Sequence, residues 1–256
     1  MKPIAFVFPG QGSQSVGMLD AWGDHPAVRE TIAEASDALN EDIGALIAGG
    51  PKEDLALTTN TQPVMLVAGV ACWRAWRAEG GALPAAVAGH SLGEYSALVA
   101  AEALPLAEAV PLVRLRAQAM QEAVPVGTGA MAAILGLDAS KIIAGCAEVT
   151  GAMGQNGTEV VEAVNFNDPV QTVIAGTKAA VDKACEVLKG MGAKRALPLP
   201  VSAPFHSSLM KPAAERLKGA LEAVDFADPK IPVVNNIDVA IEDDHDRIRD
   251  ALVRAG

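Results

Sequence analysis

The chain has 256 residues, half of them hydrophobic, and its 20 Lys and Arg against 31 Asp and Glu give a formal net charge of −11. It can therefore bury a sizeable core, which excludes disordered and fibrous proteins. The acidic balance argues against a nucleic-acid partner, because phosphate binding needs clustered basic side chains. No apolar run reaches the roughly 18 residues of a membrane helix, so we expect no membrane partner either.

The size of the chain suits one large α/β domain, or a core that carries one inserted subdomain. Its three cysteines have no CxxC spacing, which is typical of a reducing compartment. The N-terminal apolar stretch is too short for a signal peptide. These features predict a cytoplasmic protein.

Strands and helices alternate along much of the chain. Short apolar runs predict strands over 4–8 and 85–89. Helices are predicted at 25–39, 62–79, 94–102 and 106–124, with a loop at 48–61 whose threonines are candidate caps. After position 200 the pattern continues with a helix at 211–223, a strand at 231–235 and a helix at 246–254. This alternation predicts an α/β core with a parallel sheet.

The segment between 127 and 198 has a different pattern. Its elements are predicted as strand 130–137, helix 139–149, strands 160–165 and 171–175, helix 178–191 and strand 194–199. The order strand, helix, strand, strand, helix, strand is typical of a ferredoxin-like subdomain. We therefore expect 127–198 to be a ferredoxin-like insert in a core made of 1–126 and 199–256.

A five-residue motif predicts a reactive serine. Gly89-His90-Ser91-Leu92-Gly93 matches the G-x-S-x-G nucleophile elbow, with a predicted strand before it and a helix after it. The glycines are needed because a Cβ at either position would collide with neighbouring backbone. The turn exposes the serine hydroxyl, and the N-terminus of the next helix offers N–H groups to a developing oxyanion.

An elbow serine needs a base, and the chain has four histidines. His90 lies inside the elbow, where its side chain should point away from Ser91. His25 and His245 lie in polar, acidic surroundings and are expected to be solvated. By elimination, His206 is predicted to be the base.

Two further features can complete such a site. The glycine-rich loop at 9–14 lacks the third glycine of a dinucleotide-binding motif, so we predict that it aims an N–H into a neighbouring oxyanion hole. Arg114 and Arg116 lie on opposite sides of the apolar stripe of helix 106–124, and periodicity does not choose between them. An arginine that reaches the pocket would select an anionic acyl group, because a guanidinium matches a carboxylate.

Four segments occur in order along the chain: 8–14 (FPGQGSQ), 89–95 (GHSLGEY), 120–125 (MQEAVP) and 204–207 (PFHS). Together they resemble the malonyl-CoA:acyl-carrier-protein transacylase family of bacterial fatty acid synthesis. Residues 164–171 also look like the substrate-site loop of that family. The similarity runs from residue 4 to about residue 254, so it covers nearly the whole chain.

The resemblance implies an α/β-hydrolase-like core with a parallel sheet and an inserted ferredoxin-like subdomain. It implies Ser91 as nucleophile and His206 as base, with the oxyanion held by the backbone N–H groups of Gln11 and Leu92. Of the two arginines it selects Arg116 as the group that binds the malonyl carboxylate.

The resemblance extends to three further positions. It implies substrate contacts for Asn165, in the substrate-site loop, and for Phe205, directly before the base. Where the family has a glutamine whose backbone carbonyl orients the catalytic histidine, this chain has Ala255, which becomes the candidate for that role. The family chain continues with a further strand and helix, so the core is expected to lack its C-terminal part.

The implied reaction is ping-pong transfer of a malonyl group from malonyl-CoA to acyl carrier protein through a malonyl-serine. Coenzyme A enters as a thioester substrate, so we expect no cofactor, and we expect a monomer.

The acidic run at 242–246 is expected to be a solvated turn, and no Cys or His spacing supports a metal. Residues 178–195 carry five basic and two acidic side chains and are the expected docking segment for the acidic carrier protein.

Two other functions have to be weighed against this one. A serine hydrolase would use the same elbow but needs an acid between the nucleophile and the histidine. Asp138, Asp168 and Asp182 fall in that interval and are expected in a cap, a loop and a helix, which favours the transferase. A non-enzymatic, carrier-binding relative is disfavoured because Ser91 and His206 are both present.

Overall fold

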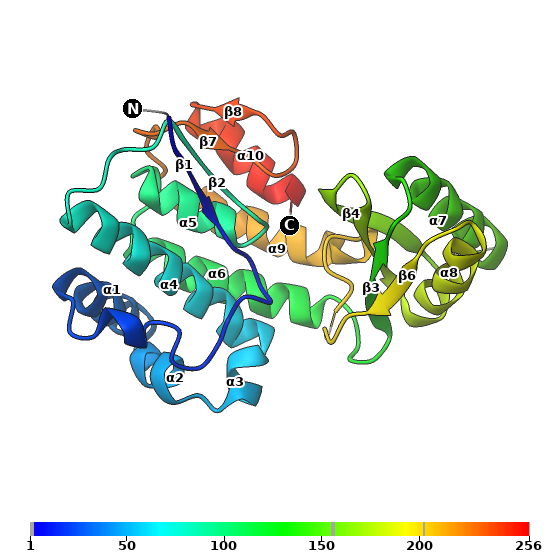
Figure 1. Ribbon diagram of the computed structural model, residues 1–256, viewed down its shortest axis with the longest axis horizontal. Coiled ribbons are helices and arrows are strands. Elements are labelled where there is room, and N and C mark those ends of the chain that lie inside the picture. The colour runs from blue at the N-terminus through cyan, green and yellow to red at the C-terminus, as the bar shows by residue number, and fades with distance from the viewer. Residues whose placement is uncertain (1–2, 155–156, 202, 256) are drawn as a thin grey trace. The chain divides into compact units, whose positions relative to one another are not determined.

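The computed structural model describes residues 3–154, 157–201 and 203–255, and the chain divides into two compact units. The first unit contains the chain up to Gln118 together with Glu215–Ala255, and the second contains Ala119–Ala214. Figure 1 shows the elements of both. The second unit is wider than the expected insert, whose boundaries at 127 and 198 stay a prediction.

The first unit is built on a four-stranded sheet. In spatial order its strands are β1 (Ala5–Phe8), β2 (Ala86–Gly89), β7 (Val233–Val234) and β8 (Ile241–Glu242). The first three run parallel, which confirms the predicted parallel sheet, and β8 is antiparallel to β7. Phe8 is the register partner of Gly89, so β1 and β2 end side by side and the loops after them leave from the same edge.

The other elements of the first unit are helices. They are α1 (Pro26–Leu39), α2 (Ile43–Gly49), α3 (Lys52–Ala56), α4 (Thr58–Ala78), α5 (Gly93–Ala100), α6 (Leu106–Glu122), α9 (Lys211–Glu222) and α10 (His245–Ala255), with a 3-10 turn η1 (Asp20–Trp22). Helix α5 is buried along its whole length and packs on β1 and β2. In the described part of the chain, no helix is both long and apolar enough to cross a bilayer.

The expected loop over 48–61 is wrong, because it contains α3 and the first turn of α4. Glu53 and Asp54 lie in the first turn of α3, where negative charge favours a helix. The hydroxyl of Thr61 donates to the carbonyl oxygens of Leu55 at 2.6 Å and Leu57 at 3.0 Å. A threonine that bonds back in this way is accommodated inside a helix and does not cap it.

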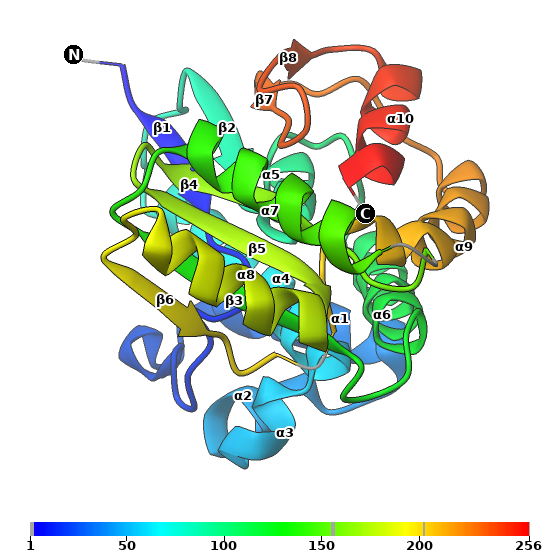
Figure 2. The same ribbon diagram turned by 90° about the vertical axis from the view of Figure 1, so that its right-hand side faces the viewer.

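The second unit contains an antiparallel sheet and two helices. Its elements are β3 (Gly129–Leu135), α7 (Ala139–Met153), β4 (Val161–Asp168), β5 (Gln171–Thr177), α8 (Lys178–Gly190) and β6 (Arg195–Pro198), followed by a 3-10 turn η2 (Ser208–Met210). The strand order is β4-β5-β3-β6, and all neighbours are antiparallel. Both helices lie on one face of this sheet (Figure 2) and pack on it through Ile134, Ile142, Ile174 and Leu188.

Candidate active site

The predicted elbow is a tight turn between β2 and α5. Ser91 lies in it with a φ of 52°, a left-handed conformation that is uncommon for a residue other than glycine. A Cβ on Gly89 would overlap the backbone of Gly93, and a Cβ on Gly93 would overlap the carbonyl oxygen of Phe8. The physical reason predicted for the two glycines is therefore confirmed.

Backbone hydrogen bonds close this turn. The N–H of Gly93 donates to the carbonyl oxygen of His90 at 2.9 Å, and that of Glu94 donates to Ser91 at 3.1 Å. Leu92 occupies the N-cap position of α5, so its N–H belongs to the helix N-terminus, where amides lack partners within the helix. This is the position predicted for one oxyanion donor.

Helix α6 brings a buried arginine to the serine. Arg116 is 4% exposed, and its Nη2 lies 3.2 Å from Oγ of Ser91. Its Nη1 donates to Oε1 of Gln62 at 2.8 Å, and its guanidinium carbon lies 5.6 Å from the centre of the Tyr95 ring. Burial lowers the pKa of Arg116, although a guanidinium stays charged in proteins. A desolvated positive charge therefore stands beside the predicted nucleophile.

The neighbouring arginine points elsewhere. Both terminal nitrogens of Arg114 donate to the carboxylate of Glu41, at 3.1 and 2.6 Å. Helical periodicity left the two arginines equivalent. The structure places Arg116, and not Arg114, beside Ser91.

A chain of hydrogen bonds connects the loop after β1 to Arg116. Oε1 of Gln11 accepts from the hydroxyl of Thr58 at 2.8 Å, and that hydroxyl accepts from Nε2 of Gln62 at 3.4 Å. Gln62 is 2% exposed and is the residue that holds Arg116. Sequence analysis did not identify Thr58 or Gln62. The available signal was a pair of polar residues four apart at the start of an otherwise apolar helix.

A second polar cluster contacts the backbone of the elbow. Asn236, in the turn after β7, accepts from the N–H of Ser91 at 3.1 Å and donates to the carbonyl oxygen of Gly89 at 2.6 Å. Glu94 is 3% exposed and accepts from the side chain and the backbone of Asn236. Burial raises the pKa of Glu94, and the bonds from Asn236 and the charge of Arg116 oppose that rise. Sequence analysis missed this cluster because Asn236 is 145 residues from the serine.

The loop over 203–207, here called the histidine loop because it contains His206, lies in the second unit. His206 is half-buried and has a φ of 64°, also in the left-handed region. Phe205, immediately before it, is 7% exposed and packs in an apolar cluster with methionines of β3 and η2. The N–H of Ser208 donates to Oε2 of Glu162 at 2.6 Å, which anchors the loop to β4.

The remaining candidate residues, Asn165 and Ala255, belong to different units. Asn165 is half-buried at an irregularity in the pairing of β4 with β5, and Ala255 is half-buried at the end of α10. Their predicted roles stay predictions. Of the other histidines, His25 caps α1 and lies 3.2 Å from Glu79, and His245 begins α10. Among the described residues, no three His, Cys, Asp or Glu side chains gather as a metal site.

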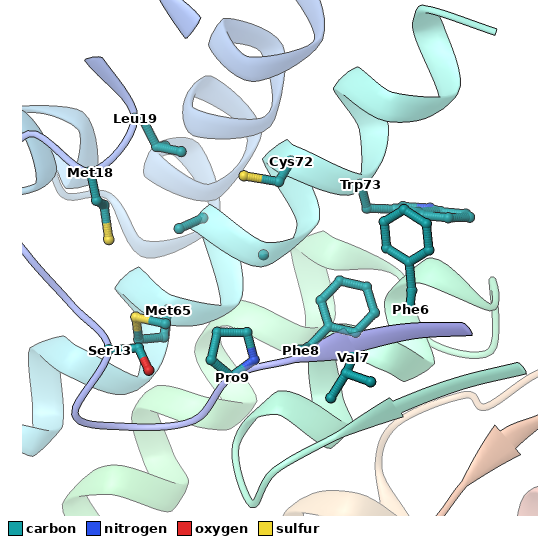
Figure 3. Close-up of a pocket in the computed structure, with 12 residues that line it drawn as sticks. Phe6, Val7, Phe8, Pro9, Ser13, Met18, Leu19, Met65, Cys72 and Trp73 are labelled. Carbon is teal, nitrogen blue, oxygen red and sulfur yellow. The ribbon is translucent and has the colours of Figure 1, made fainter. Parts of the chain in front are cut away.

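An apolar pocket of about 310 Å³ lies beside β1 in the first unit (Figure 3). It is lined from β1 and the loop after it and from α4, among others by Phe6, Val7, Phe8, Met65 and Trp73. Neither Ser91 nor Arg116 belongs to its lining. An anionic acyl group would have no charged partner there, so this pocket is not the predicted acyl site.

Comparisons with known proteins bear directly on this site. Residues 5–251 match the acyl transferase domain family. The chain is 56% identical to the malonyl CoA-acyl carrier protein transacylase of Salmonella typhimurium, over 99% of this chain and 81% of that protein. It is 65% identical to the solved acyl-carrier-protein S-malonyltransferase of Burkholderia pseudomallei, with a TM-score of 0.95 and coverage of 99% and 81%. A malonyl-transacylase solved in complex with a type II polyketide acyl carrier protein is 53% identical, with a TM-score of 0.94 and the same coverage.

The matched region contains the elbow, Arg116 and the histidine loop. More than half of the aligned residues are identical in these three relatives, the alignments cover 99% of this chain, and the solved relatives share its mixed α/β fold. The family resemblance that the sequence motifs indicated is therefore confirmed. The chain is an acyltransferase and belongs to the malonyl CoA-acyl carrier protein transacylase family.

Proposed function

We propose that this enzyme transfers a malonyl group from malonyl-CoA to the phosphopantetheine thiol of an acyl carrier protein. The observation that carries the proposal is the buried guanidinium of Arg116, 3.2 Å from Oγ of Ser91. In a malonyl thioester a single CH₂ separates the free carboxylate from the reacting carbonyl. A cation this close to the serine can therefore bind the carboxylate while the carbonyl lies at Oγ. The names of the relatives support the same activity.

The proposed chemistry is a ping-pong reaction with two acyl transfers. Oγ of Ser91 attacks the thioester carbonyl while His206 takes its proton. The C–S bond then breaks, and coenzyme A leaves as a thiol with the proton from His206. In the second half the carrier thiol gives its proton to His206 and attacks the malonyl ester, and the proton returns to Ser91 as it leaves.

Each half passes through a tetrahedral oxyanion, which we assign to the backbone N–H groups of Gln11 and Leu92. Two observations support this assignment. The loops after β1 and β2 leave the same sheet edge, and Leu92 stands at the N-terminus of α5. One such donor contributes on the order of 3 kcal/mol of transition-state stabilisation.

The remaining assignments extend the family resemblance. We assign Asn165 and Phe205 to substrate contacts and the carbonyl of Ala255 to orienting His206. Because a thioester and an ester are close in energy, the transfer needs no metal or redox cofactor. The protein is proposed to act as a monomer in the cytoplasm, where its three free cysteines would stay reduced.

We assign the first unit to the α/β-hydrolase-like folds and the segment 127–198 to the ferredoxin-like ones. The elbow at the end of a parallel strand supports the first assignment. The antiparallel order β4-β5-β3-β6, with α7 and α8 on one face, supports the second.

A serine hydrolase needs an acid between the nucleophile and the histidine. The three aspartates in that interval do not favour this role. Asp168 accepts the N–H of Val170 at 2.9 Å in the turn between β4 and β5. Asp182 pairs with Lys178 on α8 at 2.7 Å, and Asp138 stands at the N-cap of α7. Asp168 and Asp182 are thus engaged within the second unit, and Asp138 stands at a helix start there.

Product analysis separates the two activities. The enzyme is mixed with malonyl-CoA, with and without holo acyl carrier protein, and the products are identified by mass spectrometry. A transferase forms malonyl-carrier protein and little free malonate, whereas a hydrolase releases malonate at the same rate with or without the carrier. Ser91→Ala, which keeps the turn but removes the nucleophile, is the control for both products.

A further inference from the structure

The side-chain amide of Asn236 spans the elbow at 89–93, here called the nucleophile turn. Asn236 uses Oδ1 to accept the N–H of Ser91 and Nδ2 to donate to the carbonyl oxygen of Gly89. Gly89 ends β2 and Ser91 follows two residues later, so the amide connects the two sides of the bend. The opposite amide orientation would set oxygen against oxygen and N–H against N–H, and its partners therefore fix the orientation.

Glu94 in turn holds this amide. Its Oε2 accepts from Nδ2 of Asn236 and from the backbone N–H of Asn236, the latter at 2.9 Å. The carboxylate is buried in the first turn of α5, where only its partners replace the lost water. Both polar atoms of the Asn236 side chain are thus engaged with the turn or with the helix that follows it.

These contacts act on a strained part of the backbone. A positive φ at a residue such as Ser91 persists only where the surroundings hold it. The peptide units of the bend set both the direction of Oγ of Ser91 and the direction of the N–H of Leu92. A relaxed bend would therefore misplace the nucleophile and an oxyanion donor together.

We propose that Asn236 and Glu94 are a positioning pair, which holds the turn so that Oγ of Ser91 and the N–H of Leu92 face the same substrate carbonyl. The proposal rests on the acyl transfer proposed above. It places the effect of the pair on the rate of serine acylation and not on substrate affinity. Asn236 belongs to an exposed turn, so its replacement removes no core packing.

The first test removes the amide. For Asn236→Ala, single-turnover acylation of Ser91 by malonyl-CoA should slow about ten- to hundredfold, because the turn loses two hydrogen bonds. The dissociation constant for malonyl-CoA should stay at the wild-type value, and circular dichroism should show a folded protein, although buried Glu94 loses one of its partners. Ile237→Ala truncates the next, exposed residue of the same turn and should acylate at the wild-type rate. Equal rates for the two variants would overturn the proposal.

The second test replaces the Nδ2 donor of Asn236 by a group that can donate only when it is protonated. Asn236→Asp sets a carboxylate against Glu94, so one of the two binds a proton at a higher pH than an isolated carboxyl. Glu94 is also faced by Arg116 of α6 and by Asp238 of the turn, which pairs with Arg254 of α10. Once the proton is bound, an O–H donor returns. Relative to wild type, Asn236→Asp should therefore recover as the pH falls, while Asn236→Ala stays equally slow. Parallel pH profiles would contradict the proposal.

The third test exchanges the donor and the acceptor. Glu94→Gln keeps an oxygen that can accept from Asn236, and its loss should be small. Combined with Asn236→Asp, it supplies an amide that donates to the introduced carboxylate. The double variant should recover part of the rate lost by Asn236→Asp at neutral pH, because the bond to the carbonyl oxygen of Gly89 is not restored. A double variant no faster than Asn236→Asp would refute the pair.

A fluorophosphonate probe, which labels activated serines whatever their acyl substrate, is run in parallel. If the probe labels Ser91 of the wild type but malonyl-CoA does not, the proposed function fails. The positioning role of the pair is then tested by comparing the rates at which the probe labels the wild type and the variants. If malonyl enters the wild type and Asn236→Ala equally fast, the pair fails and the proposed function stands.

Discussion

The nucleophile turn and the histidine loop both place a proposed catalytic residue at positive φ, and the side chains around them differ. Ser91 has a φ of 52° and His206 has a φ of 64°, conformations that cost about 1–3 kcal/mol each. Around Ser91, glycines allow backbones to touch and the amide of Asn236 bridges the bend. Beside His206, the ring of Phe205 is buried in an apolar cluster, and the N–H of Ser208 donates to Glu162.

This difference predicts two kinds of failure. A hydrogen bond contributes about 1 kcal/mol, so losing one at the serine turn should disturb geometry and rate more than folding. Removing a buried aromatic side chain costs about 3–5 kcal/mol, so a comparable change beside the histidine should disturb folding first.

Removing the proposed base should give the largest effect. We expect His206→Ala to slow acylation about 10²- to 10⁴-fold, the usual contribution of a general base, and to leave the fold intact. Rapid-quench measurement of malonyl incorporation gives the rate. His245→Ala, at the start of α10, is the matched control, and equal rates for the two variants would mean that His206 is not the base.

Replacing the buried ring beside the base should affect stability next. Phe205→Ser should lower the free energy of unfolding by about 3–5 kcal/mol, through lost burial and a cavity. Phe166→Ser makes the same chemical change at a side chain that is 57% exposed, and it should cost far less. Urea unfolding followed by circular dichroism measures both. If the two variants are equally stable, packing of Phe205 does not hold the histidine loop.

On the serine side, the backbone contacts themselves can be broken. Gly93→Ala sets a Cβ against the carbonyl oxygen of Phe8 and should destabilise the first unit by about 3 kcal/mol. Gly49→Ala is the control, because a Cβ there meets nothing within 4 Å. Thermal unfolding measures both, and a melting temperature for Gly93→Ala as high as that for Gly49→Ala would show that the turn tolerates a side chain.

The arginine should decide which acyl group the serine accepts. A charge-assisted pair in a desolvated pocket contributes about 1.5–3 kcal/mol, so Arg116→Ala should lose about ten- to hundredfold in kcat/KM for malonyl-CoA. The slower reaction with acetyl-CoA, which has no carboxylate, should be spared. Arg114→Ala, which breaks only the pair with Glu41, should keep the selectivity. Equal losses of Arg116→Ala on both substrates would remove the assigned role.

Charge reversal at the end of α8 and before β6 should have the smallest effect. Lys178 and Lys183 of the expected docking segment already pair with acids on α8. Reversing Lys189 and Lys194 to Glu should therefore raise the KM for carrier protein a few-fold and leave Ser91 malonylation unchanged. Added salt should weaken the wild-type reaction more than that of the variant. Lys218→Glu on α9 is the control, and an equal KM for both variants would place the carrier elsewhere.

The sequence predicted the parts of the site that are encoded locally. The elbow is five consecutive residues between a strand and a helix, so its glycines and its serine could be identified from spacing alone. His206 has no comparable motif and was reached by elimination. Asn236 could not be found, because it meets its partners only after the chain has folded and a single polar residue produces no periodic pattern.

The fold shows the same difference between features that are encoded locally and contacts that form only on folding. The strands and helices from β3 to β6 occur in the predicted order, and most of them are long enough for their periodicity to show. Strand β8 has two residues, and α3 has five within a segment rich in turn formers, so neither produces a clear pattern. The pairing of β7 with β2 joins segments that no local signal relates.

The proposed malonyl group on Ser91 is tested most directly by the mass of the intact protein. The full-length enzyme is mixed with malonyl-CoA, quenched in acid and weighed, and then treated with holo acyl carrier protein. We predict one malonyl adduct that Ser91→Ala lacks and that the carrier removes as malonyl-carrier protein. An adduct of equal size in Ser91→Ala, or transfer to the carrier without any adduct on the wild type, would contradict the account.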